Sequence, residues 1–176
     1  MSPQQARFWN ELVQLRGHID YLTLYHSQCE YIDRSLQIVI AVSSSGSIAT
    51  WAVWGELPLL WASIIAAGQF FMVVRSYLPF QSRIKATAEM ASKLEGLFVQ
   101  WEGCWQQVAV GELTEGEINT SITRFKKTKV DLLDAHLKHV SLPERTALLE
   151  RAERAANRYF EVVYGTGGGN GENEVA

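Results

Sequence analysis

Two charge-free apolar stretches, separated by only two residues, are the feature that most constrains this chain. The first covers Leu36–Trp54 and the second covers Leu57–Val74, with Gly55 and Glu56 between them. At about 1.5 Å per helical residue each stretch spans about 27–28 Å, close to the ~30 Å hydrocarbon thickness of a bilayer. Every backbone N–H and C=O in lipid needs an internal partner, so both stretches must be helical there. The sequence therefore predicts a transmembrane helical hairpin over residues 36–74.

Basic residues lie on both sides of this hairpin but are missing from its turn. Arg34 precedes the first stretch, and Arg75 and Arg83 follow the second, whereas the turn carries an acid. Because Lys and Arg resist translocation, both flanks and both termini are expected in the cytoplasm, with the Glu56 turn on the other side of the membrane. The alternative is a hairpin buried in a soluble core. A chain of 176 residues has little other apolar surface to cover two such helices.

Long amphipathic helices are expected before and after the hairpin, which makes the fold class all-α. Residues 1–35 read as a cytoplasmic N-terminal helix that begins with a capping box of Ser2 and Gln5. Its apolar residues recur every three or four positions: Phe8, Leu12, Leu15, Ile19, Leu22 and Tyr25. Residues 75–165 read as a cytoplasmic helical region, and residues 166–176, rich in Gly and Asn, are expected to be disordered.

A heptad-like apolar seam runs along the helix predicted over Ser82–Val110. Its positions are Ile84, Thr87, Ala91, Leu94, Phe98, Trp101, Trp105 and Val108. Such a seam suits packing against the first helix or against a neighbouring subunit. We expect a homo-oligomer in which Leu94, Phe98, Trp101 and Trp105 form the contact.

The rest of the helical region is divided by its capping signals. Gly111 ends the seam helix, and Thr114 and Glu117 form a capping box that opens the next one. A last helix is expected over Pro143–Tyr164, with Gly165 as its C-cap.

The chain carries no sequence motif for catalysis. It contains no Gly-rich phosphate loop, cysteine pair or nucleophile motif, and its net charge of -3 gives no general attraction to nucleic acid. His136 and His139 lie near two aspartates, a spacing that a metal site permits and that solvated helix residues also show. A basic cluster of Arg124, Lys126, Lys127 and Lys129 suits a solvated face, although lipid headgroups remain an alternative partner. We expect no enzyme activity, cofactor, metal ion or nucleic-acid partner.

Small residues fill the middle of the first apolar stretch. Such residues let helices approach closely, and their hydroxyls bond to their own backbone, to a neighbouring helix or to water in a pore. A buried amide in the second stretch also needs a hydrogen-bond partner. The candidate pore-lining or helix-packing residues are Ser43, Ser44, Ser45, Gly46, Ser47, Thr50 and Gln69. Packing within the hairpin and an oligomeric interface or pore both remain open.

The layout from about Ala6 to Lys138 resembles the SLATT family, bacterial two-transmembrane effector domains associated with nucleotide-sensing antiphage systems. The resemblance rests on an aromatic stretch, Tyr21–His26, that leads into the small-residue span, and on a second span that ends in Phe70–Arg75. It implies an antiviral defence effector that oligomerises and perturbs or permeabilises the inner membrane. A separately encoded sensor or nucleotide-signalling protein would trigger it, since this chain has no fused sensor domain.

The alternative function is a passive membrane anchor that scaffolds a cytoplasmic helical bundle. The small residues of 43–47 favour the effector, because a mere anchor would insert more stably with Leu or Val at these positions.

Overall fold

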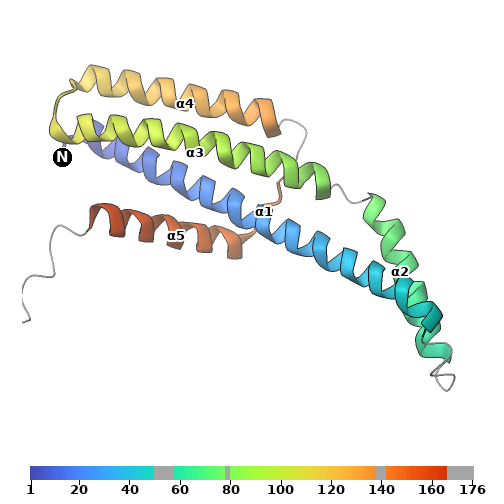
Figure 1. Ribbon diagram of the computed structural model, residues 1–176. Coiled ribbons are helices and arrows are strands. Elements are labelled where there is room, and N and C mark those ends of the chain that lie inside the picture. The colour runs from blue at the N-terminus through green and yellow to red at the C-terminus, as the bar shows by residue number, and fades with distance from the viewer. Residues whose placement is uncertain (50–57, 78–79, 138–141, 166–176) are drawn as a thin grey trace, which may run out of the picture. The chain divides into compact units, whose positions relative to one another are not determined.

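The computed structural model describes residues 1–49, 58–77, 80–137 and 142–165. These residues form five helices and no strand, so the all-α prediction is confirmed (Figure 1). The helices are α1 (Pro3–Ala49), α2 (Pro58–Tyr77), α3 (Phe80–Val110), α4 (Glu115–Leu137) and α5 (Thr146–Tyr164). They divide into two compact units. We call Met1–Tyr25 with Ala86–Ala176 the bundle unit, and His26–Lys85 the hairpin unit.

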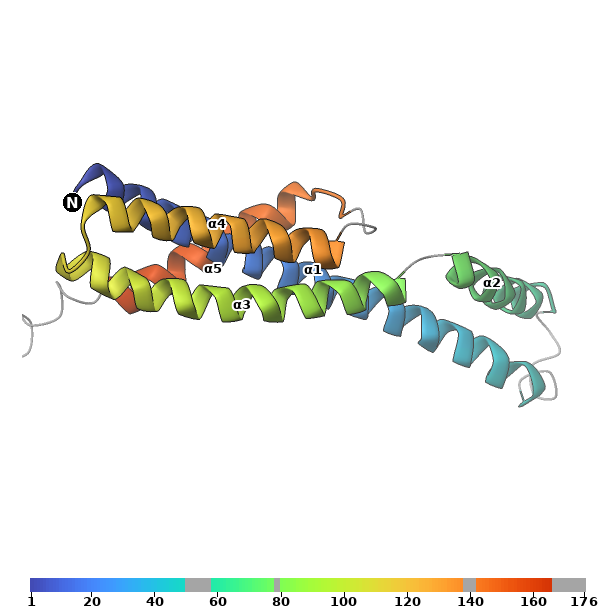
Figure 2. The ribbon, with the colours of Figure 1, turned by 90° about the horizontal axis from the view of Figure 1, so that it is seen from above.

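The bundle unit is built on an antiparallel pair, α1 and α3. The side-chain amide of Gln5 donates to the backbone carbonyl of Val108 at 2.9 Å, and the Arg16 guanidinium lies 3.1 Å from the Glu95 carboxylate. The α4 helix runs parallel to α1, because Asn119 pairs with Arg7 and Lys126 pairs with Glu11. Figures 1 and 2 both place α4 beside α3, and Figure 1 shows α5 on the opposite side of the α1–α3 pair.

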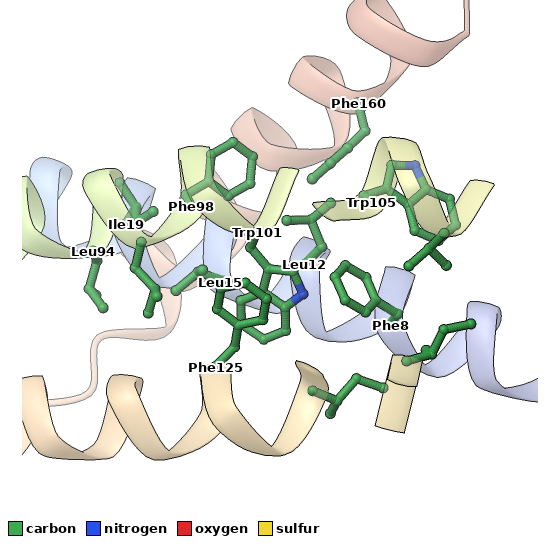
Figure 3. Packing of buried hydrophobic residues seen from close by; sticks show 14 of the residues in the cluster. Phe8, Leu12, Leu15, Ile19, Leu94, Phe98, Trp101, Trp105, Phe125 and Phe160 are labelled. Carbon is green, nitrogen blue, oxygen red and sulfur yellow. The ribbon is translucent and has the colours of Figure 1, made fainter. Parts of the chain in front are cut away.

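The core of the bundle unit is rich in aromatic side chains contributed by several helices (Figure 3). Trp101 is fully buried; its ring stacks on Phe125 with centroids 5.0 Å apart and meets Phe8 edge-on at 5.7 Å. On the other side, Trp9 packs edge-on against Phe160 of α5 at 4.9 Å. Each large side chain buried in this way stabilises the fold by about 1.5–3 kcal/mol, so the aromatic contacts hold all four helices together.

The seam of α3 packs inside the chain, which corrects the predicted oligomer contact. Leu94, Phe98, Trp101 and Trp105 are 0–5% exposed and belong to one core cluster with the apolar stripe of α1. Side chains that are already buried in the monomer cannot also contact another copy. The alternative contact with the first helix is the one that the structure shows.

Both predicted capping boxes are confirmed by reciprocal hydrogen bonds. The backbone N–H of Ser2 donates to the Gln5 side chain at 2.7 Å, and that of Gln5 donates back to Ser2 Oγ at 3.3 Å. Thr114 and Glu117 make the same pair of bonds, at 2.8 and 3.4 Å, at the start of α4. Each box satisfies backbone donors that the first turn of a helix leaves unpaired.

A glycine ends α3 as predicted. Gly111 has φ +82°, a left-handed conformation in which a side chain would be strained. Its N–H donates to the carbonyl of Val108 at 3.2 Å, and the N–H of Glu112 donates to Gln107 at 3.1 Å. This Schellman pattern satisfies the last carbonyls of α3 and lets α4 begin after only a few residues.

The last helix begins three residues later than predicted. We expected it to start at Pro143, whereas α5 starts at Thr146 and Arg145 is extended. Tyr21 explains the difference, because its hydroxyl donates to the carbonyl of Pro143 at 2.7 Å and accepts from the N–H of Arg145 at 3.3 Å. These bonds hold the backbone of this segment out of the helix. The C-cap at Gly165 is confirmed by its N–H bond to Glu161 at 2.8 Å.

The hairpin unit combines the second half of α1 with α2 and the start of α3. It begins at His26, whose Nδ1 lies 3.1 Å from the carbonyl of Ile84. Within the described ranges, none of the helices combines enough length with enough apolar character to cross a bilayer. The predicted turn at Gly55 and Glu56, as well as the predicted disordered tail, lie outside the described residues.

Candidate functional site

Two small residues bring α1 and α2 together inside the hairpin unit. Gly68 is buried, and a Cβ added to it would overlap the side chain of Ser43. The Ser43 hydroxyl donates to the carbonyl of Val39, one turn earlier in α1, at 2.7 Å. The backbones of the two helices therefore approach closely at this point, as small residues permit. For Ser43 the structure shows helix packing, with the hydroxyl satisfied by its own helix.

The other candidate residues of the hairpin are placed less fully. Gln69, the amide of the second apolar stretch, is exposed. The side chains of Ser44, Ser45, Gly46 and Ser47, together with Thr50, lie outside the described residues. Gly68 was missed by the sequence reasoning. Its signal was present, because it is the one glycine within Leu57–Val74.

Large apolar side chains are exposed along the hairpin unit. Leu59 is 83% exposed, Phe70 63% and Val42 62%, and Ile38 and Val73 are also more than half exposed. Among the described side chains of this unit, the buried residues are Cys29, Asp33 and Gly68, so these side chains form little apolar core. A concentration of exposed apolar groups of this kind marks a surface that contacts lipid or another protein.

Polar contacts gather at the other end of the hairpin unit. The carboxylate of Asp33 is buried and accepts a hydrogen bond from the side-chain amide of Gln37 at 2.6 Å. His26 lies 3.4 Å from the carboxylate of Glu30. Along α1 these side-chain contacts lie between His26 and Gln37, and the exposed aliphatic side chains Ile38, Val39 and Val42 follow them.

An ion-pair cluster centred on Arg16 joins α1, α3 and α5 in the bundle unit. The guanidinium lies 3.2 Å from Asp20 and 3.1 Å from Glu95, and it stacks 4.5 Å from the ring centre of Tyr159. Burial raises the pKa of Asp20 above its ordinary value, although the neighbouring Arg16 opposes this shift. One carboxylate oxygen of Asp20 is buried and has no hydrogen-bond partner in the described part of the chain, so the ionised form is poorly solvated there.

Glu102 of α3 anchors the end of α5 through two tyrosines. The hydroxyl of Tyr159 donates to its carboxylate at 2.8 Å, and that of Tyr164 donates to the same oxygen at 3.0 Å. Burial and this carboxylate raise the pKa of Tyr159 to about 12 and also raise the pKa of Tyr164. Both hydroxyls therefore stay protonated at neutral pH and keep donating. No periodic pattern predicts these contacts, which join residues 57 and 62 positions apart.

The residues considered for metal binding do not form a metal site in the described part of the chain. No group of three or more His, Cys, Asp and Glu side chains is positioned to hold a metal ion among the described residues. His136 lies 3.8 Å from Glu89, and His139 is outside those residues. In the basic cluster, Lys126 pairs with Glu11, and Lys129 contacts the ring of His18 at 3.3 Å.

Comparison of the chain with protein-family models, curated proteins and solved structures found no match. The SLATT resemblance therefore rests on the residues quoted for it. The features that bear on function are the apolar surface of the hairpin unit and the buried core of the bundle unit.

Proposed function

We propose that this chain is a membrane effector of a bacterial antiphage defence system. In this proposal the hairpin unit inserts into the inner membrane, and the bundle unit lies in the cytoplasm. A separately encoded sensor or nucleotide-signalling protein then triggers oligomerisation, which perturbs or permeabilises the membrane. The observation that carries the proposal is the exposed apolar surface of the hairpin unit, with Leu59, Phe70 and Val42 all more than 60% exposed.

The sequence supplies the length that insertion requires. The apolar stretches Leu36–Trp54 and Leu57–Val74 hold 19 and 18 residues without a charge, and both extend into residues 50–57. Exposing this much apolar surface to water costs about 25 cal/mol per Å², so transfer to lipid is favourable. The close approach at Ser43 and Gly68 supports the same view, because small-residue contacts are a usual means of helix association in membranes.

The bundle unit constrains how an oligomer forms. Its seam residues, Trp101 and Trp105 among them, are buried in its own core and are unavailable to another copy. Oligomerisation is therefore proposed to use the apolar faces of the hairpin unit, such as those of Ile38 and Val42. The outer surface of the bundle unit is left for the sensor protein.

Site-specific fluorescent labels test insertion. Cysteine introduced at Phe70 or Val42, in a chain with Cys29 and Cys104 replaced by Ala, would carry an environment-sensitive dye. Cysteine at Val99 or Val130, exposed positions on the bundle unit, provides matched controls. With lipid vesicles, we expect a blue shift and lipid-borne quenching for the hairpin labels alone. Hairpin labels that stay in water would contradict the proposal.

Membrane potential separates an effector from a passive anchor. Replacing Ser44 and Ser47 with Leu makes the first apolar stretch more favourable to insert but removes two hydroxyls and adds bulk. An effector should then insert normally but no longer depolarise cells when it is induced together with its sensor. Unchanged depolarisation in the double variant would remove this segment from the mechanism. A wild-type chain that inserts and never depolarises cells would favour the anchor.

A further inference from the structure

A groove of about 450 Å³ lies between α1 and α5 in the bundle unit. Val13, Gly17 and Tyr21 line it from α1, and Leu149 and Ala156 line it from α5. The Tyr21 hydroxyl is bonded to the segment that precedes α5, at Pro143 and Arg145, and this fixes the position of the ring. The groove has the volume of a small-molecule site and largely apolar walls.

Gly17 is the first observation that favours a binding role for the groove, because its missing side chain leaves the groove open. A glycine in the interior of a helix costs about 0.5–1 kcal/mol relative to alanine. Close packing does not explain this one, because a Cβ at Gly17 would meet no atom within 4 Å. Its φ is not in the left-handed region either, since Gly111 is the one described residue with positive φ. The effect of Gly17 on the structure is the space that it leaves in the groove.

Two carboxylates at the groove are the second sign. Glu144 and Glu153 both line it, and among the described residues neither has an ion-pair or hydrogen-bond partner. Asn157 adds an amide. His18 brings no opposing charge at neutral pH, because partial burial and the nearby Lys129 lower the pKa of its ring. Lys129 itself contacts His18 from α4 and is not part of the lining. The charge of the lining is therefore negative.

We propose that this groove binds a small organic cation, with an apolar body on Val13, Gly17 and Leu149 and an ammonium group near Glu144 and Glu153. The apolar walls account for the body of the ligand, and the unpaired carboxylates account for its charge. The groove lies entirely in the bundle unit, so this inference does not depend on what the hairpin unit does.

Three indole compounds of similar size test the charge. Tryptamine is a cation, tryptophol is neutral and indole-3-propionate is an anion, and each would be titrated into the full-length chain. The methyl NMR signals of Val13 and Leu149 report on the groove. We expect saturable shifts with tryptamine and at least ~10-fold weaker binding of the other two, the size of one modest charge interaction. Equal binding of all three, or no saturable shift with millimolar tryptamine, would overturn the proposal.

Variants test the location. Leucine at Gly17 should fill the groove and abolish tryptamine binding, whereas leucine at Gly96, a helical glycine of α3 with equally open surroundings, should leave it unchanged. Replacing both Glu144 and Glu153 with Gln should weaken binding at least ~10-fold. Gly17→Ala should keep the fold, because its Cβ has room. Undiminished binding in the Gly17→Leu or double Gln variant would place the site elsewhere and refute the assignment.

Discussion

Trp101 offers a sharp test of how the bundle core is held together. Its ring is fully buried, and its indole N–H has no hydrogen-bond partner among the described residues. A buried donor left unpaired costs about 1–3 kcal/mol. Replacing Trp101 with Phe removes that donor but also leaves a small void, which costs about 1–2 kcal/mol in a packed core. The two effects nearly cancel, so Trp101→Phe should change the free energy of unfolding by less than about 1 kcal/mol.

Trp105 provides the matched control in the same helix. It is 5% exposed and packs on Phe8 and Trp9, with ring centres 5.9 and 5.0 Å away. Its N–H is not among the buried, unpartnered atoms of the described residues. Trp105→Phe therefore loses buried volume without removing an unpaired donor, and it should lower the free energy of unfolding by about 1–2 kcal/mol.

Thermal unfolding of the full-length chain, followed by far-UV circular dichroism, measures both variants. For a chain of this size 1 kcal/mol corresponds to about 2–4 °C, so Trp105→Phe should lower Tm by about 2–8 °C. The Tm of Trp101→Phe should stay within about 4 °C of the wild-type value and above the Tm of Trp105→Phe. Equal losses in Tm would refute the reasoning, because they would mean that the indole N–H of Trp101 carries no penalty.

Three further predictions follow from the polar clusters and the hairpin. Gly68→Leu should force α2 away from Ser43 and lower the free energy of unfolding by about 1–3 kcal/mol through overpacking. Ala66→Leu, at an exposed position of the same helix, should have little effect on Tm. Similar Tm values for the two variants would contradict the close approach of α1 and α2. Glu102→Ala should leave two tyrosine hydroxyls without their acceptor and lower the free energy of unfolding by about 1–2 kcal/mol. Amide hydrogen exchange across α5 should then be faster than in wild type. Glu102→Gln keeps an acceptor, so its α5 amides should exchange more slowly than those of the Ala variant. Because the folded chain raises the pKa of Asp20, it binds that proton more tightly than the unfolded chain does, and stability from this group should fall as pH rises from the ordinary value of 3.8 through the raised pKa. Asp20→Asn should remove that part of the pH dependence, and an unchanged slope in urea unfolding would argue against the shift.

Much of the helical architecture was predictable because it depends on local chemistry. The apolar residues of α1 from Phe8 onward, and those of the α3 seam from Leu94 onward, recur with helical spacing and are buried. The capping boxes at Ser2 and Thr114 use residues only three positions apart, and both formed. Periodicity identifies a buried face, but it does not say which partner covers it. For that reason the sequence allows the α3 seam to pack against either the first helix or a neighbouring subunit, and the structure shows that α1 of the same chain covers it.

The parts that sequence reasoning missed depend on contacts between distant residues. Tyr21 delays the start of α5 through bonds across 122 and 124 positions, and Glu102 collects two tyrosines of α5. Gly68 is recognisable as the one glycine of its apolar stretch, but its contact with Ser43 of α1 cannot be inferred from spacing. The α1–α5 groove likewise depends on which face of each helix turns toward the other. Hydrophobic spacing carries no information on such pairings.

The pairing of α1 with α3 also sets the order in which the chain folds. Gln5 and Val108 are bonded across 103 positions, so the ribosome must add about a hundred residues before α1 meets its partner. At about 5–20 residues per second, that interval lasts about 5–20 s. During it the apolar stripe of α1 has no partner from α3, whereas α3 and α4 are joined by a short turn and can pair as soon as both exist. The apolar stripe of the nascent N-terminal helix therefore lacks its α3 partner until most of α3 has been synthesised.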